Sequence, residues 1–288
     1  MDSNELIRKV RRIEIRTKAL SHQIFQGQYH SAFKGLGMAF SEVRQYDYGD
    51  DVRFIDWNVT ARFNQPYVKI FEEERELTVA LLIDVSGSNK FGTRHELKAD
   101  LITELAAVLS FSAIFNNDKV GVIFFSNKVE KFIPPKKGRS HILRIISELV
   151  SHEPTCIQTN VGEALRYLTN AIKKKCTAFV MSDFLDSGFE QAIRIAANKH
   201  DLVALNIMDR GEDAIPDLGL LNLSDPETGQ FFLADTSSER FRAQYQQWWQ
   251  QKRAKNSEIF KKAGVNAINL HTDRDYVKSL TEFFQARI

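Results

Sequence analysis

The sequence lacks most features of membrane, secreted or disulfide-bonded proteins. Only two of its 288 residues are cysteine and six are proline. The longest apolar stretches, 79–85 and 120–125, fall far short of the roughly 20 residues that cross a bilayer. The first five residues show no basic stretch followed by an apolar run, as a secretory signal would. Cys156 and Cys176 could in principle pair, but one isolated pair is no disulfide framework, so we expect free structural thiols in a cytoplasmic protein.

An excess of charge of one sign is also lacking. Lysine and arginine number 39 against 37 aspartates and glutamates, so bulk charge does not predict a nucleic-acid binder. Basic residues gather only locally, in amphipathic helices expected at 5–25 and 238–263. Binding of nucleic acid or of a membrane surface through these helices is an alternative. A solvated helix face on the protein's own domain is favoured, so no nucleic-acid partner is expected and peripheral membrane contact is the less favoured reading.

Apolar runs of strand length alternate with helical patterns from residue 77 onward. The run 77–83 is continuous, as in strands that are covered on both faces. Strand–helix alternation at this spacing predicts a doubly wound α/β fold with a mostly parallel sheet. Strands are expected at 77–83, 119–125, 129–133, 178–182, 202–208 and 265–270, and helices at 96–115, 140–151, 161–173, 189–199, 238–263 and 276–285.

A hairpin interrupts this alternation at about 210–237. Its two short strands, 220–223 and 231–234, flank a turn. We therefore predict two regions. Residues 1–76 form an N-terminal helical/β extension with the basic helix and a segment rich in charges and aromatics. Residues 77–288 form the α/β domain, with the small β-hairpin as an insertion.

Oxygen-bearing side chains follow the carboxyl ends of the predicted strands, where open α/β sheets bind ligands. Their oxygens suit a hard cation such as Mg²⁺, or Mn²⁺ or Ca²⁺, and the lack of histidine and cysteine disfavours zinc. Neutral hydroxyls would leave the ion electrophilic and able to recruit an acidic side chain of another protein. Helix capping is the alternative role of these hydroxyls, but it does not explain the second aspartate. The predicted ligands are Asp84, Ser86, Ser88, Thr159 and Asp183.

This pattern of ligands resembles a known cation site. The string Asp84-x-Ser86-x-Ser88, followed by Thr159 and Asp183 on the expected elements, is similar to the metal-ion-dependent adhesion site (MIDAS) of von Willebrand factor type A domains. The resemblance implies a type A-like fold for the α/β domain, a bound divalent cation and a role in protein–protein interaction.

A second resemblance involves the segment upstream of the first buried strand. The string Glu42-Val-Arg44-x-Tyr46-x-x-Gly49-Asp50-Asp51-x-Arg53-x-Ile55-Asp56-Trp57-x-x-x-Ala61-Arg62 closely resembles the signature of bacterial proteins called domain of unknown function 58. Together with the type A-like domain the resemblance extends over nearly the whole chain from about Gly35. It implies a type A-like domain and a MoxR-type AAA+ ATPase as the partner, and it brings no settled biochemical activity.

The charges of this signature segment alternate in sign, which is suited to bidentate carboxylate–guanidinium pairs. We expect a structural network that pins the segment against the sheet, with Trp57 anchored in a core. If the network is exposed instead, it is a partner-binding surface, so burial distinguishes the two roles. The network residues are Glu42, Asp50, Asp51 and Asp56 with Arg44, Arg53 and Arg62.

These patterns favour a non-enzymatic interaction module without catalytic residues. No G-x-S-x-G elbow, Walker A string or dinucleotide fingerprint occurs. The alternative is a metal-dependent hydrolase of phosphate esters, with Asp183 as base. Against it, Ser86 stands where aspartyl-phosphate chemistry would want a second acid, and the sequence places no histidine or lysine obviously nearby.

Overall fold

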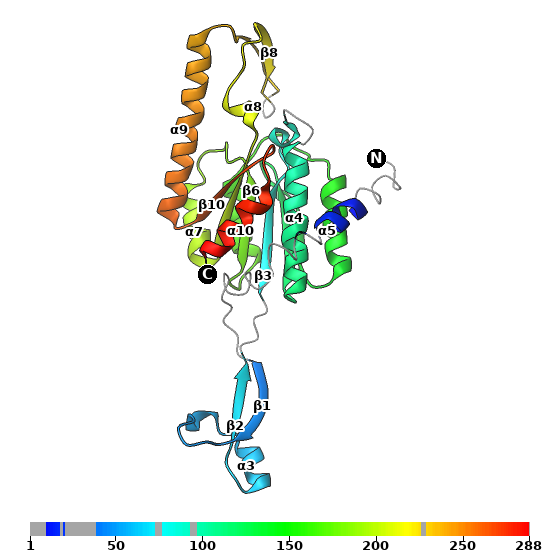
Figure 1. Ribbon diagram of the computed structural model, residues 1–288, viewed down its shortest axis with the longest axis vertical. Helices are drawn as coiled ribbons and strands as arrows, with labels where there is room; N and C mark the ends of the chain where they lie inside the picture. The colour runs from blue at the N-terminus through cyan, green and yellow to red at the C-terminus, as the bar shows by residue number, and fades with distance from the viewer. Residues whose placement is uncertain are drawn as a thin grey trace. The chain divides into compact units, whose positions relative to one another are not determined.

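The chain divides into two compact units in the computed structural model (Figure 1). One unit comprises residues 1–32 and 78–288, and the other comprises residues 33–77. The division thus groups the first 32 residues with the α/β domain and leaves the signature segment as a unit of its own. The structure describes residues 10–17, 20, 39–72, 77–92, 97–225 and 229–287.

The larger unit is built on a six-stranded sheet with the order β10-β7-β6-β3-β4-β5. All neighbouring pairs are parallel except β4 and β5, which are antiparallel. The chain builds outward from β3 in both directions, so the strand order reverses there and the carboxyl end of β3 lies at a topological switch point. The predicted doubly wound, mostly parallel sheet is confirmed. Its strands are β3 (Thr78–Asp84), β4 (Lys119–Phe125), β5 (Val129–Lys136), β6 (Thr177–Ser182), β7 (Asp201–Met208) and β10 (Asn266–His271).

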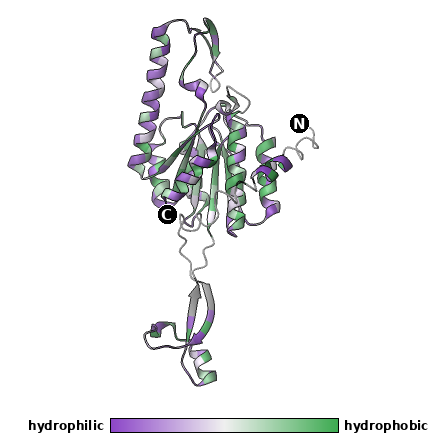
Figure 2. Cartoon of the chain, viewed as in Figure 1, coloured by the Kyte–Doolittle hydropathy of each residue, from purple (hydrophilic) through white to green (hydrophobic). Residues whose placement is uncertain are grey.

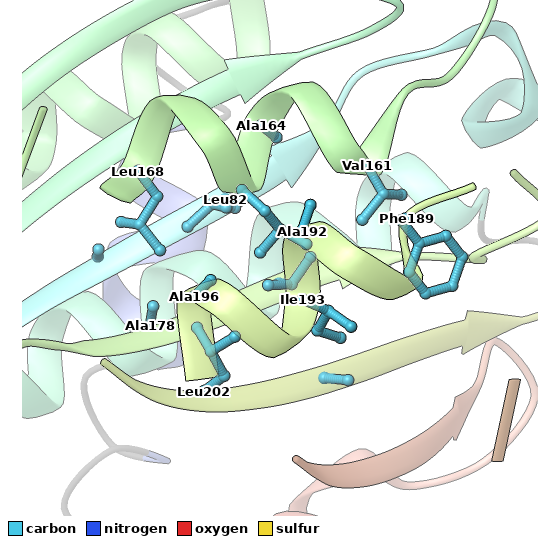
Figure 3. Packing of buried hydrophobic residues seen from close by; sticks show 14 of the residues in the cluster. Leu82, Val161, Ala164, Leu168, Ala178, Phe189, Ala192, Ile193, Ala196 and Leu202 are labelled. Atoms are coloured by element: carbon cyan, nitrogen blue, oxygen red, sulfur yellow. The ribbon is translucent and has the colours of Figure 1, made fainter. Parts of the chain in front are cut away.

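Helices cover both faces of this sheet, as its nearly continuous apolar strands require. On one face α6 and α7 pack over Leu82 and Ala178, with Leu168 and Ile193 pointing inward (Figure 3). Phe179 belongs to the opposite face, where its ring meets that of Phe284 of α10 edge to face. The helices are α4 (Lys98–Phe115), α5 (Arg139–Ser151), α6 (Val161–Ala171), α7 (Glu190–Lys199), α8 (Arg210–Asp213), α9 (Glu239–Ala263) and α10 (Tyr276–Ala286).

The edge strand β5 is longer than the sequence indicates. The prediction ended it before Pro134, yet β5 continues through Pro134 and Pro135 to Lys136. Proline is compatible with an edge strand because its missing N–H faces no neighbour there. Gly121 of β4 makes room for it, since a Cβ at this position would lie 2.8 Å from the Cγ of Pro135.

The basic N-terminal helix is described over residues 10–17 and packs on the larger unit. Ile13 is buried, Arg139 Nε donates to Glu14 Oε1 at 2.7 Å, and Arg16 pairs with Glu104 at 2.6 Å. Its apolar side therefore faces its own domain, as predicted, and most of the remainder of the expected helix lies outside the described residues.

The predicted hairpin is present as β8 (Leu220–Ser224) and β9 (Phe231–Asp235), which pair antiparallel between α8 and α9. Both cysteines are free, as expected. Of the helices that the structure describes, none has the length and apolar character needed to span a bilayer.

The smaller unit is a two-stranded antiparallel sheet with a short helix between its strands. β1 (Ala39–Gln45) pairs with β2 (Tyr67–Glu72), and η1 (Val52–Phe54) and α3 (Trp57–Phe63) connect them. Asp56 caps α3 by accepting from the backbone N–H groups of Asn58 and Val59. A unit with a single thin layer has no second layer of its own to cover apolar side chains.

Candidate functional site

The carboxyl ends of β3 and β6 bring the predicted acidic ligands to one place, because the two strands are parallel neighbours. Ser182 Oγ donates to Asp84 Oδ2 at 2.6 Å, and the backbone N–H of Ser86 donates to Asp84 Oδ1 at 2.9 Å. Asp183 follows Ser182 directly, and its negative charge acts on Asp84. The two aspartates therefore belong to one buried cluster, which we call the strand-end site.

The two serines of the first loop extend this cluster. Ser86 Oγ and Ser88 Oγ are 3.1 Å apart and both side chains are buried. Ser86 precedes η2 (Gly87–Lys90) but makes no side-chain capping bond, so helix capping does not account for its hydroxyl. Asn89, which the sequence analysis did not single out, fixes the loop through Nδ2, which donates to the carbonyl of Asp84 at 2.8 Å.

Thr159 lies on a neighbouring loop before α6. The two loops meet where the N–H of Gly87 donates to the carbonyl of Ile157 at 2.8 Å. Asn160, not Thr159, provides the side-chain cap of α6 by accepting from the N–H of Glu163. The structure therefore joins Asp84, Ser86 and Ser88 to the end of β6 by direct interactions, and it places Thr159 on the adjacent loop.

A lysine that the sequence analysis missed completes the site. Lys98 is fully buried at the start of α4, with Nζ 2.9 Å from Asp183 Oδ2 and a second ion pair to Glu212 of α8. The prediction that no lysine lies nearby was wrong, because α4 brings its first residue to this edge of the sheet. The available signal was a lysine that opens an otherwise apolar, buried helix.

The electrostatics of the site show a shortage of positive charge. Burial and the charge of Asp183 raise the pKa of Asp84 to about 7, although the hydrogen bonds from Ser182 and Ser86 oppose this. Burial lowers the pKa of Lys98, but Asp183 and Glu212 outweigh it and raise the pKa, so Lys98 is an ammonium. Burial also raises the pKa of Glu212. The site thus holds three buried acidic groups and one ammonium, which pairs with Asp183 and Glu212.

This donor set fits a hard divalent cation, which prefers carboxylate and hydroxyl oxygens and would balance the surplus negative charge. The described residues contain no group of three or more His, Cys, Asp or Glu placed to hold a metal, so any cation here depends on the hydroxyls. The five predicted ligands are only 1–9% exposed. A partner's side chain would reach a bound ion only after the surrounding loops open.

The signature segment has a different character, because its arginines and Trp57 are exposed and its network aspartates are only partly buried. Arg44 Nη2 lies 2.7 Å from Asp50 Oδ1, and Arg53 Nη2 lies 2.6 Å from Asp51 Oδ2. The hydrogen bond from Arg53 lowers the pKa of Asp51 to about 2.

Trp57 does not anchor a core. Its side chain is 69% exposed, so this prediction was wrong. Within residues 39–72 of its unit, the thin sheet offers no second layer to cover the indole. Asp56, besides capping α3, pairs with Lys69 at 3.4 Å, while Glu42 lies on β1 and Arg62 on α3. This exposure favours the partner-surface role of the segment.

Residues 42–255 match the family described as "Protein of unknown function DUF58". The chain belongs to the DUF58 family. An uncharacterized protein of Mycobacterium tuberculosis is 28% identical to this DUF58 protein over 293 residues, which cover 100% of this chain and 91% of that protein. An uncharacterized Mycobacterium avium protein is 24% identical over 161 residues, 54% of this chain and 93% of the other.

Solved structures share the fold of this DUF58 chain at low sequence identity. The conserved hypothetical protein BatB of Bacteroides thetaiotaomicron has a TM-score of 0.51 and 17% identity, covering 73% of this chain and 98% of BatB. An aerotolerance-related membrane protein of Bacteroides fragilis has a TM-score of 0.50, with the same identity and coverage. These similarities support the α/β fold of the larger unit and bear on nothing beyond it.

Proposed function

We propose that this DUF58 protein is a non-enzymatic protein-interaction module whose strand-end site binds Mg²⁺ or another hard divalent cation. The cation would capture an acidic side chain of a protein partner. The ligands are Asp84, Ser86, Ser88, Thr159 and Asp183. The observation that carries the proposal is the buried surplus of carboxylate over ammonium beside two hydroxyls 3.1 Å apart.

Each group in this site has a distinct part in binding. Asp84 supplies negative charge, and its orientation is fixed by Ser182 and by the backbone of Ser86. The serine hydroxyls add oxygens without charge, so a bound cation would keep a strong attraction for a carboxylate that enters from outside. Asp183 is partly neutralised by Lys98, which limits how much charge it offers to the ion.

The partner in this proposal is a MoxR-type AAA+ ATPase, and the two proteins would act together in the cytoplasm in chaperone-like assembly or regulation. This assignment comes from the family resemblance of the signature segment. The exposed charges and aromatics around Trp57 support it as a further contact surface, because aromatic and arginine side chains are enriched at protein interfaces.

The presence of Lys98 in the site does not support the alternative function, a metal-dependent hydrolase. Lys98 is held as an ammonium by two carboxylates, so it is no proton acceptor. Asp183, the base in that alternative, already accepts from Lys98 and from the N–H of Leu185 at 3.3 Å.

Calorimetric titration with Mg²⁺ and Mn²⁺ tests the cation site. We expect wild-type protein to bind, and Asp84→Ala to lose binding while keeping its circular dichroism spectrum. Glu258→Ala, which removes an exposed carboxylate of α9, should bind like wild type. Absence of binding by wild-type protein at millimolar cation would overturn the site.

Capture of the MoxR-type ATPase of the same organism tests the partner. The protein should retain the ATPase in Mg²⁺ and release it in chelator, and Asp84→Ala should fail to retain it in either. Equal capture with and without chelator would show that the cation mechanism is wrong. Cation binding without any capture would overturn the partner alone.

A further inference from the structure

The segment 211–239, which contains the hairpin, is acidic along its whole length. It holds seven aspartates and glutamates and no lysine, arginine or histidine. The protein as a whole is nearly balanced at +2, so this segment concentrates negative charge. We call it the acidic arm.

One face of the hairpin in this arm is exposed throughout. The pairs Leu220–Asp235, Asn222–Leu233 and Ser224–Phe231 share that face, because paired residues of antiparallel strands point the same way. We call these six residues the outer face. Its large apolar side chains form a stripe and are 68% (Leu220), 71% (Phe231) and 71% (Leu233) exposed. The apolar hairpin stands out in the hydropathy colouring of Figure 2.

The opposite face of the hairpin is better covered. It carries Ala234, which is 2% exposed, Leu221 and Leu223, which are half-buried, and Phe232, which is 50% exposed. The two faces of this small sheet therefore differ in degree: the outer face presents three apolar side chains that are 68–71% exposed, and the opposite face presents one, Phe232, at 50%. Two-stranded sheets have little stability of their own, so a covering partner would add to it.

The arm is held in place at both ends. Near its start, Glu212 pairs with Lys98, and Asp213 pairs with Arg253 of α9. Near its end, Thr236 Oγ1 donates to the carbonyl of Gly219 at 2.6 Å, and Arg242 donates to the carbonyl of Thr236 at 2.6 Å. The outer face is thus presented on a fixed support, which reduces the entropy lost when a partner binds.

We infer that the outer face of the acidic arm is a docking surface for a protein partner that presents an apolar ridge bordered by lysine or arginine. The stripe supplies the apolar contact, and Asp235 on the same face attracts basic side chains. Three other carboxylates of the arm, Glu212, Asp213 and Asp217, form ion pairs with Lys98, Arg253 and Arg242. A stripe of three side chains is much smaller than the roughly 800 Å² that each partner buries in a stable complex. A complex held by this face alone would therefore be weak and transient, whether the partner is another protein or a second copy.

A peptide probe tests the inference without knowledge of the natural partner. The probe is a fluorescein-labelled amphipathic helix of about 18 residues with leucine on one face and lysine on the other, compared with its leucine–glutamate counterpart. Fluorescence anisotropy should show binding of the lysine peptide and none of the glutamate peptide. Phe231→Ser with Leu233→Ser should weaken binding at least about tenfold.

Two further variants define the surface. Asn222→Lys places a positive charge in the centre of the outer face and should also weaken binding of the lysine peptide. Ile195→Ser, which removes an apolar side chain of α7 that is 53% exposed, is the matched control and should bind like wild type. Equal affinity of wild type and the Phe231/Leu233 variant would overturn the inference, as would a preference for the glutamate peptide.

The outer face could instead bind a membrane surface or a second copy of the chain, and two measurements would reveal this; either result would replace the inferred partner. Sedimentation of vesicles that contain phosphatidylserine would reveal a membrane surface if the arm variants abolish it. Sedimentation velocity would reveal self-association if wild type dimerises and the variants do not. The inference does not use the cation: peptide affinity should be the same in Mg²⁺, in chelator and in Asp84→Ala, so the two proposals can fail separately.

Discussion

The strand-end site and the outer face of the acidic arm are unusual in opposite ways, because charged side chains are normally exposed and large apolar side chains are normally buried. The site buries charge, with Asp84 at 1% and Lys98 at 0% exposure, whereas the outer face exposes Phe231 and Leu233 at 71%. Buried charge and exposed apolar area both reduce the stability or solubility of a folded chain. Neither region is explained by packing alone, which is why both are sites of proposed binding.

Among the variants that test the strand-end site, Lys98→Met should cause the largest change in the free energy of unfolding. Removing the ammonium leaves Asp183 and Glu212 buried without a counter-charge, which should destabilise the protein by about 3–5 kcal/mol. Urea unfolding in chelator measures the free energy of unfolding. Lys278→Met removes an exposed lysine of α10 and should change it by less than about 0.5 kcal/mol. If Lys98→Met is as stable as wild type, Lys98 does not balance the site.

A smaller effect, with a distinctive pH dependence, is expected from Asp84→Asn. The pKa of Asp84 is raised to about 7 in the folded protein from a usual value of 3.8, so the folded state keeps a proton that the unfolded state has released. Cation-free wild type should therefore lose up to about 4 kcal/mol of stability as the pH rises from 4 to 7.

The asparagine variant carries no proton to lose at this position, so it should lack that part of the pH dependence. It also gives up one of the two hydrogen-bond acceptors that Ser182 and Ser86 use, at a cost of about 1 kcal/mol. We expect it to be less stable than wild type at pH 4 and more stable at pH 8. Parallel stability curves for the two proteins would contradict a buried, uncompensated Asp84.

The smallest change in the free energy of unfolding is expected from a substitution on the outer face. Leu233→Ser should change the free energy of unfolding by less than about 0.5 kcal/mol, because its side chain is largely in water in the folded state. Thermal unfolding monitored by circular dichroism measures this. A loss of 2 kcal/mol or more would show that the outer face is covered within the free protein, which would remove the reason to assign it to a partner.

The sequence predicts the elements of the α/β unit well because their signals are local. Continuous apolar runs mark β3, β4 and β6, and the turn residues between 224 and 231 mark the hairpin. The oxygen ligands could be grouped because parallel strands end at one edge of a sheet. Such inferences need only the period of the pattern and the direction of the strands.

Contacts between distant residues could not be predicted in this way. Lys98 and Asp183 are 85 residues apart and meet only because α4 packs against the sheet. A lysine that opens an apolar helix can signal burial, but it does not indicate which carboxylate it will meet. The prediction that Trp57 anchors a core was wrong because a residue type was taken as evidence of burial. Tryptophan usually indicates a core, but the described part of the unit that carries it consists of a thin sheet and two short helices, η1 and α3.

The ion pair between Lys98 and Glu212 has a consequence for how this chain can be shortened. Hairpin insertions at the edge of a domain are usually dispensable, and deletion at such a place leaves the parent fold intact. Here the first turn of the insertion contributes one of the two carboxylates that neutralise an interior lysine. Trimming the loop back to a tight turn would leave that lysine with half of its counter-charge, so the added segment has become a structural part of the domain to which it was joined.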